Sequence, residues 1–295
     1  MKTECVPIED VRPLSGAEYE RLEDGAILFF AEAPVEIFPD DRDVLLNQKP
    51  AEAAYHKNVA YRPLEDRLTG GANPALHGVM KRFSANAVRS LQQVLPQYAA
   101  GWSIDYASFR PQEEAGRQLK LHARNDLVHI DAFPSRPTNG ARILRLFVNL
   151  NPVQNRVWVT GDTFDALAER FARDPRLRRA WESPSLASAP ALRGLLTRFR
   201  VPAARRSPYD RFMLAFHNFL KENDAFQRTC SKQQFEFPPN SSWLVFTDTV
   251  SHSVLSGQYA LEQTLIVPRE LLRRPDRAPI GILERIAARP LTVAS

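Results

Sequence analysis

The sequence predicts a mostly β fold with α-helical insertions, built on a double-stranded β-helix (jelly roll) with buttressing helices. Short apolar segments bounded by Pro- and Gly-containing turns recur on both sides of a helical insertion at about residues 162–230. Two histidines, His129 and His252, lie on an early and a late predicted strand, which are neighbours in the mouth of such a barrel. We treat residues 1–295 as a single domain.

Composition supports a globular protein, with 44% hydrophobic and 25% charged residues. No apolar run approaches the length of a bilayer span, and the N-terminus has no apolar signal core, which argues against export. Two cysteines are too few for a disulfide framework and fit a reducing compartment. We therefore expect a cytoplasmic protein.

The first part of the chain is predicted to be an irregular lead-in (1–24), a strand at 26–31 and a short helix at 40–47, followed by a mixed polar stretch. Asn73-Pro74 is typical of a helix start, since a capping residue precedes a proline. Apolar residues then recur every three or four positions up to Val94, and Pro96 ends the helix. This helix should buttress a sheet.

Three strands are expected next, at 102–110, 118–129 and 142–151, and a fourth begins at 156. The insertion should contain helices after Asp162, at 177–181, at 192–199 and after Ser207, and we interpret His217 beside the last one as structural or exposed. Strands resume at 235–237, 242–247 and 259–267, and a short helix is expected at 280–288.

The segment His129-Ile130-Asp131 carries the strongest chemical signal. Residues two apart in a strand point to the same face, so His129 and Asp131 should project together. An imidazole and a carboxylate are two of the three ligands of a facial iron site, and His252 would be the third. Alone, His-x-Asp is a weak motif that also occurs with ordinary half-buried histidines; the flanking strands and the second strand-borne histidine strengthen it.

This constellation resembles the iron(II)/2-oxoglutarate-dependent oxygenases, and within them the Kdo 3-hydroxylases of Gram-negative bacteria. The resemblance is carried by His129 to Thr138, Arg142 to Arg145, Tyr209 to Leu214, Leu220 to Asn223, and Gln227.

The resemblance implies that iron(II) is held by His129, Asp131 and His252, that 2-oxoglutarate and O2 are co-substrates, and that ascorbate supports activity. It also implies hydroxylation at C3 of a Kdo sugar in Kdo-lipid A to give the product called Ko. Two neutral imidazoles and one carboxylate would leave a positive centre that attracts the anionic co-substrate.

The sequence departs from many relatives at Glu262, where they have an Arg or Lys that binds the far carboxylate of 2-oxoglutarate. A buried dianion needs a cation, so we look to the strand after His-x-Asp. Arg145, Phe147 and Asn149 should face inward together, which makes Arg145 the expected anchor and Asn149 a neighbour of the co-substrate. We expect Arg142 to contact substrate. Gln263 and Thr264, which follow Glu262, are further candidate co-substrate contacts.

Between Arg173 and Arg206 there are nine Arg, no Lys and only two acidic residues. A charge run is usually a solvated face, but guanidinium groups match phosphate and carboxylate geometry. No aromatic-interleaved or helix-turn-helix pattern indicates nucleic acid. We therefore expect this segment to cover a Kdo-containing lipid A and to rest peripherally on the anionic inner membrane.

Two other interpretations remain open at this stage. An oxygenase of the same class could act on a peptide or a free amino acid, because substrate choice depends on loops. A cupin-like binding module with zinc or no catalytic metal is the non-enzymatic alternative, which the absence of a cation at position 262 favours. Iron-dependent formation of succinate would separate the enzymes from the binding module.

Overall fold

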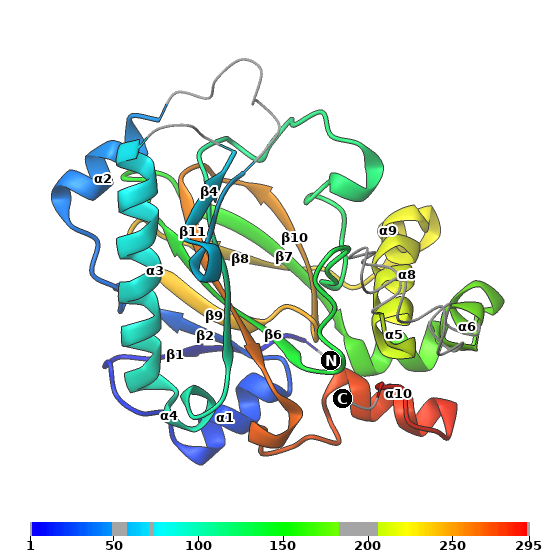
Figure 1. Ribbon diagram of the computed structural model, residues 1–295. Helices are drawn as coiled ribbons and strands as arrows, with labels where there is room; N and C mark the ends of the chain where they lie inside the picture. The colour runs from blue at the N-terminus through cyan, green and yellow to red at the C-terminus, as the bar shows by residue number, and fades with distance from the viewer. Residues whose placement is uncertain (1, 49–57, 71–73, 183–205, 294–295) are drawn as a thin grey trace.

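The structure is a computed structural model that describes residues 2–48, 58–70, 74–182 and 206–293. Its centre is an eight-stranded sheet in the order β1-β2-β9-β6-β11-β5-β3-β4 and a three-stranded sheet in the order β10-β7-β8 (Figure 1). All pairings are antiparallel except that of β1 with β2. This arrangement is the expected jelly-roll-like core, accompanied by helices.

The strands are β1 (Cys5–Pro7), β2 (Ile27–Phe30), β3 (Val59–Arg62), β4 (Arg67–Thr69), β5 (Ser103–Arg110), β6 (Arg142–Asn149), β7 (Arg156–Thr163), β8 (Gln233–Phe237), β9 (Ser242–Phe246), β10 (Val250–Ser256) and β11 (Ala260–Val267). The α-helices are α1 (Gly16–Glu23), α2 (Pro39–Leu46), α3 (Pro74–Val94), α4 (Pro96–Ala99), α5 (Phe164–Phe171), α6 (Pro175–Glu182), α8 (Pro208–Glu222), α9 (Asp224–Thr229) and α10 (Pro279–Ala287).

Strand β6 shows how the two faces of the large sheet differ. Leu144, Leu146 and Val148 belong to the main core, whereas Phe147 belongs to a smaller apolar cluster between the two sheets. In that cluster Phe147 packs on Trp158 of the small sheet, with ring centroids 4.8 Å apart. The alternation of a strand therefore gives β6 one face toward the barrel interior, as predicted for Arg145, Phe147 and Asn149.

Helix α3 covers the other face of the large sheet (Figure 1). The apolar stripe predicted from its sequence is buried, from Leu76 through Phe83 and Leu91 to Val94. Ser84 on the same face donates a hydrogen bond of 2.8 Å to the side-chain oxygen of Gln263 on β11. The helix thus fixes β11 from outside, which is the buttress that its periodicity indicated.

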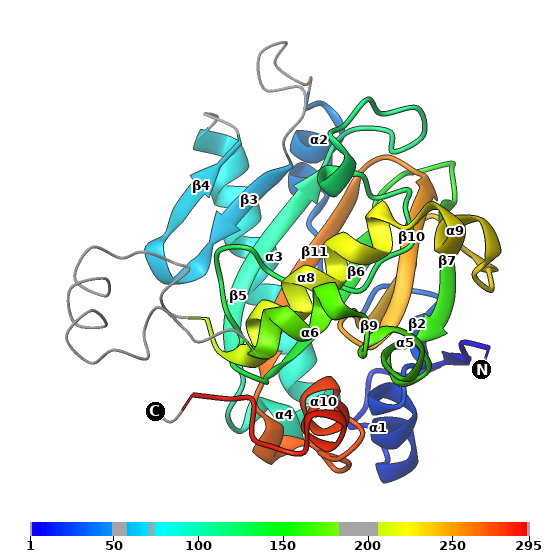
Figure 2. The ribbon, with the colours of Figure 1, turned by 90° about the vertical axis from the view of Figure 1, so that its right-hand side faces the viewer.

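Helices α5, α6, α8 and α9 lie between β7 and β8 in the sequence and gather at one end of the barrel (Figure 2). Helix α8 begins with a capping box, in which the Ser207 and Asp210 side chains bond to each other's backbone N–H groups. Its His217 reaches the backbone oxygen of Ile130 through Nδ1, at 2.7 Å. Helix α8 is therefore attached directly to the His-x-Asp segment.

Two of the predictions for the early chain were wrong. The strand expected at 118–129 is a loop with one 3-10 turn at Leu121–Ala123, and only His129 forms a bridge. Its polar side chains up to Asp126 offer no alternating buried face. The lead-in at 1–24 contains β1 and α1, and the capping box of α1, Ser15 with Glu18, could have been recognised in the sequence.

Most of the Arg-rich segment, including the helix predicted at 192–199, lies outside the described residues. In the part that is described, Arg176 and Arg178 form ion pairs with Asp174 and Glu182 on the surface. No described helix combines the length and the apolar character needed to span a membrane.

Candidate active site

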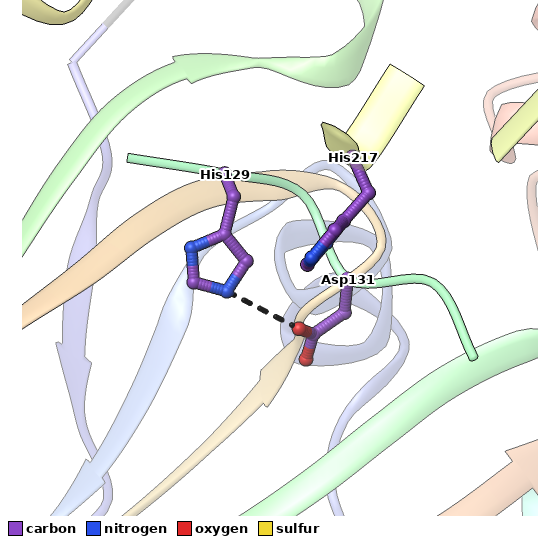
Figure 3. A group of neighbouring side chains, drawn as sticks. All are labelled: His129, Asp131 and His217. Atoms are coloured by element: carbon purple, nitrogen blue, oxygen red, sulfur yellow. Dashed lines mark ion pairs between the residues drawn. The ribbon is translucent and has the colours of Figure 1, made fainter. Parts of the chain in front are cut away.

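His129 and Asp131 project to the same side, as the strand parity predicted. The Nε2 atom of His129 lies 3.5 Å from Oδ1 of Asp131 (Figure 3), and Nε2 of His252 lies 3.9 Å from Oδ2. Between them Ile130 turns into the main core. Three side chains that are distant in the sequence thus converge on one point inside the barrel mouth.

Backbone hydrogen bonds hold the two histidines in register. The His129 N–H donates to the His252 carbonyl at 3.0 Å, and the His252 N–H donates to the His129 carbonyl at 2.8 Å. In each ring Nδ1 donates to a backbone oxygen, that of Leu127 for His129 and that of Val250 for His252. Each ring is therefore fixed in the tautomer that leaves Nε2 with a free lone pair directed at Asp131.

Burial controls the charge of these groups. It lowers the pKa of His129 to about 3 and also lowers the pKa of His252, so both imidazoles are neutral at physiological pH. Burial by itself would raise the pKa of the Asp131 carboxyl group. The charge of Arg145 and the two imidazoles outweigh burial and hold this pKa well below its usual value. The site therefore offers two neutral nitrogens and one carboxylate, all deprotonated and ready for a cation.

A third imidazole stands beside this group. His217 of α8 packs edge-on against His129 at 5.0 Å between centroids, and its ring faces Asp131 (Figure 3). His129, Asp131 and His217 offer ligand atoms that lie within 4.8 Å of one another. The hydrogen bond of His217 to Ile130 is a structural contact, as expected, whereas its place beside His129 and Asp131 depends on the docking of α8, which the sequence does not reveal.

The residues fit an iron(II) ion by an observation independent of any resemblance. Oδ2 of Asp131 is buried and accepts no hydrogen bond within the described part of the chain. Nitrogen and carboxylate ligands suit iron(II), and the two cysteines lie elsewhere, at Cys5 and Cys230. An ion bound by His129, Asp131 and His252 would occupy the coordination positions of this oxygen, which otherwise has the Arg145 guanidinium at 3.2 Å as an ion-pair partner, and of both free Nε2 lone pairs.

Glu262 lies between two arginines from the neighbouring strands. Arg145 of β6 lies 3.3 Å from one of its carboxylate oxygens, and Arg110 of β5 lies 2.5 Å from the other. The same Nη1 of Arg145 is 3.2 Å from Oδ2 of Asp131. Arg110 also lies 3.8 Å from a carboxylate oxygen of Glu114. A metal ion bound to Asp131 would compensate the charge of that carboxylate, and the guanidinium groups of Arg145 and Arg110 would then suit an additional carboxylate.

Arg110 was missed in the sequence. Glu262 pairs across the sheet with Ser108 of β5, and Arg110 lies two residues further on the same face. The pairing register of β5 with β11 depends on the tertiary structure, and the sequence of β5 alone indicates only a strand with polar interruptions. The clue available in the sequence was its alternation of polar residues at Ser108 and Arg110 with the buried Phe109.

Two of the expected contacts, Arg142 and Asn149, have other surroundings. Arg142 is fully buried on the helical side, where it pairs with Asp248 and stacks on Phe246. Asn149 donates to the backbone oxygens of Gln154 and Phe237. A ligand of either residue would have to displace these contacts, although Nη1 of Arg142 has no hydrogen-bond partner among the described residues. The roles predicted for Arg142 and Asn149 stay predictions.

Gln263 and Thr264 point to opposite faces of β11. Gln263 faces α3 and bonds to Ser84, so it is directed away from the metal group. Thr264 lies directly across from Arg145 and donates to Glu262 at 2.9 Å. Only Thr264 of this pair borders the cationic region, as the alternation of a strand requires.

The comparisons with known proteins agree with this geometry. Residues 11–290 match the sequence model of the family described as 3-deoxy-D-manno-oct-2-ulosonic acid (Kdo) hydroxylase. The chain matches no curated protein significantly.

Solved structures of the Kdo hydroxylase KdoO, a non-heme Fe(II) alpha-ketoglutarate-dependent dioxygenase, are similar over nearly the whole length. The cobalt(II) complex has a TM-score of 0.84 at 30% identity and covers 99% of both chains. The complex with alpha-ketoglutarate and Fe(III) has a TM-score of 0.82 at 30% identity and covers 98% of both chains. The complex with succinate and Fe(III) has a TM-score of 0.82 at 29% identity and covers 99% of both chains.

Proposed function

The chain belongs to the Kdo hydroxylase family and is an Fe(II)/2-oxoglutarate-dependent dioxygenase, and from that premise we propose which residues perform the reaction and on which molecule. Its substrate is a Kdo sugar, and its cofactor and co-substrates are iron(II), 2-oxoglutarate and O2. The observation that carries the proposal is the buried group of two neutral imidazoles and one carboxylate beside a cationic interior.

His129, Asp131 and His252 bind the iron. His252 is preferred over His217 as the third ligand because His129 and His252 are joined by two backbone hydrogen bonds and move as one unit. An iron(II) ion held by these three residues would keep positions open for the co-substrate and O2. A fourth protein ligand would remove the position that O2 requires, so His217 has a different role.

Arg145 anchors the far carboxylate of 2-oxoglutarate, with Arg110 beside it. Both reach Glu262, which stands where many relatives have the anchoring cation. Glu262 holds the two guanidinium groups in place, and an iron ion on Asp131 would leave Arg145 available to the far carboxylate of 2-oxoglutarate. Two cations from neighbouring strands thus replace the single cation that many relatives have at this position. The absence of a cation at position 262 therefore no longer favours a non-enzymatic binding module.

When bound, the iron supplies activation of O2 for insertion of oxygen into a carbon–hydrogen bond, coupled to decarboxylation of 2-oxoglutarate. The chain's own residues provide geometry and exclusion of water. Tied Nδ1 atoms keep His129 and His252 in a fixed orientation. The aromatic cluster around Phe147, Trp158 and Trp243 closes the barrel below the site. Such enclosure keeps the hydrogen-abstracting step on the substrate.

The acceptor is C3 of Kdo in Kdo-lipid A, and the product is Ko. Arg206, at the end of the Arg-rich segment, donates to the backbone oxygen of Pro134, in the loop that follows Asp131. This contact brings Arg206 beside the loop that follows Asp131, and its charge would suit a lipid A phosphate next to the sugar. Peripheral contact with an anionic membrane surface follows from the same charge.

The test asks which acceptor molecule stimulates the consumption of 2-oxoglutarate. Purified protein with iron(II), ascorbate and 2-oxoglutarate is given Kdo-lipid A, free Kdo or a peptide mixture, and succinate is measured. We expect strong stimulation by Kdo-lipid A only. Equal stimulation by free Kdo would contradict the lipid A context, and stimulation by peptides alone would contradict the sugar substrate.

A further inference from the structure

Lys221 near the end of α8 is a buried cation that forms no close ion pair with the described residues. Its relative exposure is 3%. The ammonium group donates to the backbone oxygen of His122 at 3.0 Å, and no carboxylate of the described ranges lies within ion-pair distance of it. Burying an ammonium group is costly, and burial lowers the pKa of Lys221 to about 8, although the charges of Asp131 and Asp126 act in the opposite direction. A bound anion would offset this cost.

The position of Lys221 places it at the metal group. It lies one turn after His217 on the same helix face, and His217 contacts Ile130 and His129. Burial lowers the pKa of His129, His217 and His252, and the charge of Lys221 acts on all three in the same direction. Helix α8 therefore presents a cation near the metal group, on the helix face that carries His217.

The substrate of the family carries a matching anion. Kdo is an ulosonic acid, whose carboxylate carbon, C1, is separated from C3 by C2 alone. If C3 is the carbon that reacts, the carboxylate must lie close to the metal group, and it needs a cation there. Resting on the proposed function, we propose that Lys221 binds the carboxylate of Kdo and so presents C3 to the site.

Other cations near the rim are already engaged. Arg136 pairs with Asp105 at 3.0 Å and stacks on Tyr106 and Phe133, and it is partly exposed. Arg145 and Arg110 share Glu262 on the co-substrate side. Lys221 can form a charged hydrogen bond without breaking an existing ion pair, which makes it the best suited of these cations.

A merely structural role is the alternative, because Lys221 and Glu222 both bond to His122 and could simply hold the loop. The two roles differ in how they respond to the substrate's charge. A residue that holds the loop affects all substrates alike, whereas a residue that binds the carboxylate discriminates between a substrate that has it and one that lacks it.

The experiment crosses enzyme and substrate variants. Wild type, Lys221→Met and Lys221→Arg are assayed on Kdo-lipid A and on a synthetic form in which the Kdo carboxylate is a primary amide. Lys232→Met is the matched control, since Lys232 also donates to a backbone carbonyl but is exposed. Binding of cobalt(II) and of 2-oxoglutarate is measured in every variant.

Wild type should prefer the acid over the amide in kcat/KM by about 10- to 100-fold, mostly through KM. Lys221→Met should lose that preference, Lys221→Arg should recover part of it, and Lys232→Met should keep it. Cobalt(II) and 2-oxoglutarate binding should not change. An acid preference that persists in Lys221→Met would overturn the proposal.

A measurement on the unaltered protein keeps the proposal testable if a variant does not fold. In crystals of the cobalt(II) and 2-oxoglutarate complex with a Kdo glycoside, the sugar carboxylate should contact Nζ of Lys221; a carboxylate bound by another cation refutes the role. If wild type adds no oxygen to Kdo-lipid A at all, it is the proposed function that fails, whatever Lys221 does.

Discussion

Replacing Arg145 by alanine tests the co-substrate site most sharply. In the unliganded interior Arg145 and Arg110 share Glu262, and Arg145 is 12% exposed in its side chain. Without Arg145 the remaining pair of Arg110 and Glu262, 2.5 Å apart, is neutral. The far carboxylate of 2-oxoglutarate would then be buried without a net positive charge to receive it.

Leaving a buried carboxylate unpaired costs about 2–5 kcal/mol. At 1.4 kcal/mol for each tenfold change, this weakens 2-oxoglutarate binding by about 30-fold to several thousandfold. The assay is calorimetric titration of the cobalt(II)-loaded protein with 2-oxoglutarate. Cobalt(II) affinity is measured separately, because Arg145 also helps to keep the pKa of Asp131 low, although burial raises it.

The fold should survive this change, since Glu262 keeps its bonds to Arg110, Ser108 and Thr264. Arg178→Ala is the matched control, an arginine of α6 that pairs with Glu182 on the surface. A 2-oxoglutarate affinity within about threefold of wild type, with cobalt(II) still bound, would refute the assignment of Arg145 and transfer it to Arg110.

Three further predictions address the metal group and the buried lysine. Asp131→Ala should bind no stoichiometric iron(II) and form no product while keeping a wild-type circular dichroism spectrum; normal turnover would contradict its role as a ligand. His217→Gln should still bind one iron(II) per chain, as measured by metal analysis, and loss of the metal would make His217 the third ligand instead of His252. Lys221→Met should raise the stability of the metal-free protein at pH 7 by about 3 kcal/mol in urea unfolding, since the pKa of Lys221 falls from 10.5 to about 8 in the folded state, at about 1.36 kcal/mol for each unit. This cost is full below pH 8 and is relieved as the pH rises toward the unfolded value, so the gap between variant and wild type should close above pH 10.5; a gap that widens refutes it.

The sequence predicts those features of the site that depend on the alternation of side chains along a strand. The shared face of His129 and Asp131 and the inward position of Arg145 follow from the strand period of two, and both are present in the structure. The buttress α3 follows from its helical stripe. The same reasoning, applied strictly, would have separated Gln263 from Thr264, because neighbours in a strand face opposite sides.

The residues that reach the site through the pairing of distant segments could not be predicted from the sequence. Arg110 joins the site through the register of β5 with β11, and His217 and Lys221 join it because α8 docks on the loop that carries Ile130 and His122. The stretch 118–129 was mistaken for a strand because the true element is a single bridge at His129, stabilised by His252 rather than by its own sequence.

The central claim is that this iron- and 2-oxoglutarate-dependent oxygenase hydroxylates C3 of Kdo. It is tested most directly by incubating Kdo-lipid A with the protein, iron(II), ascorbate and 2-oxoglutarate under isotopically labelled O2, followed by tandem mass spectrometry. A product heavier by one labelled oxygen, located on C3 of the Kdo unit, is the predicted result. An unchanged Kdo-lipid A while succinate still accumulates, or label at another carbon, would contradict it.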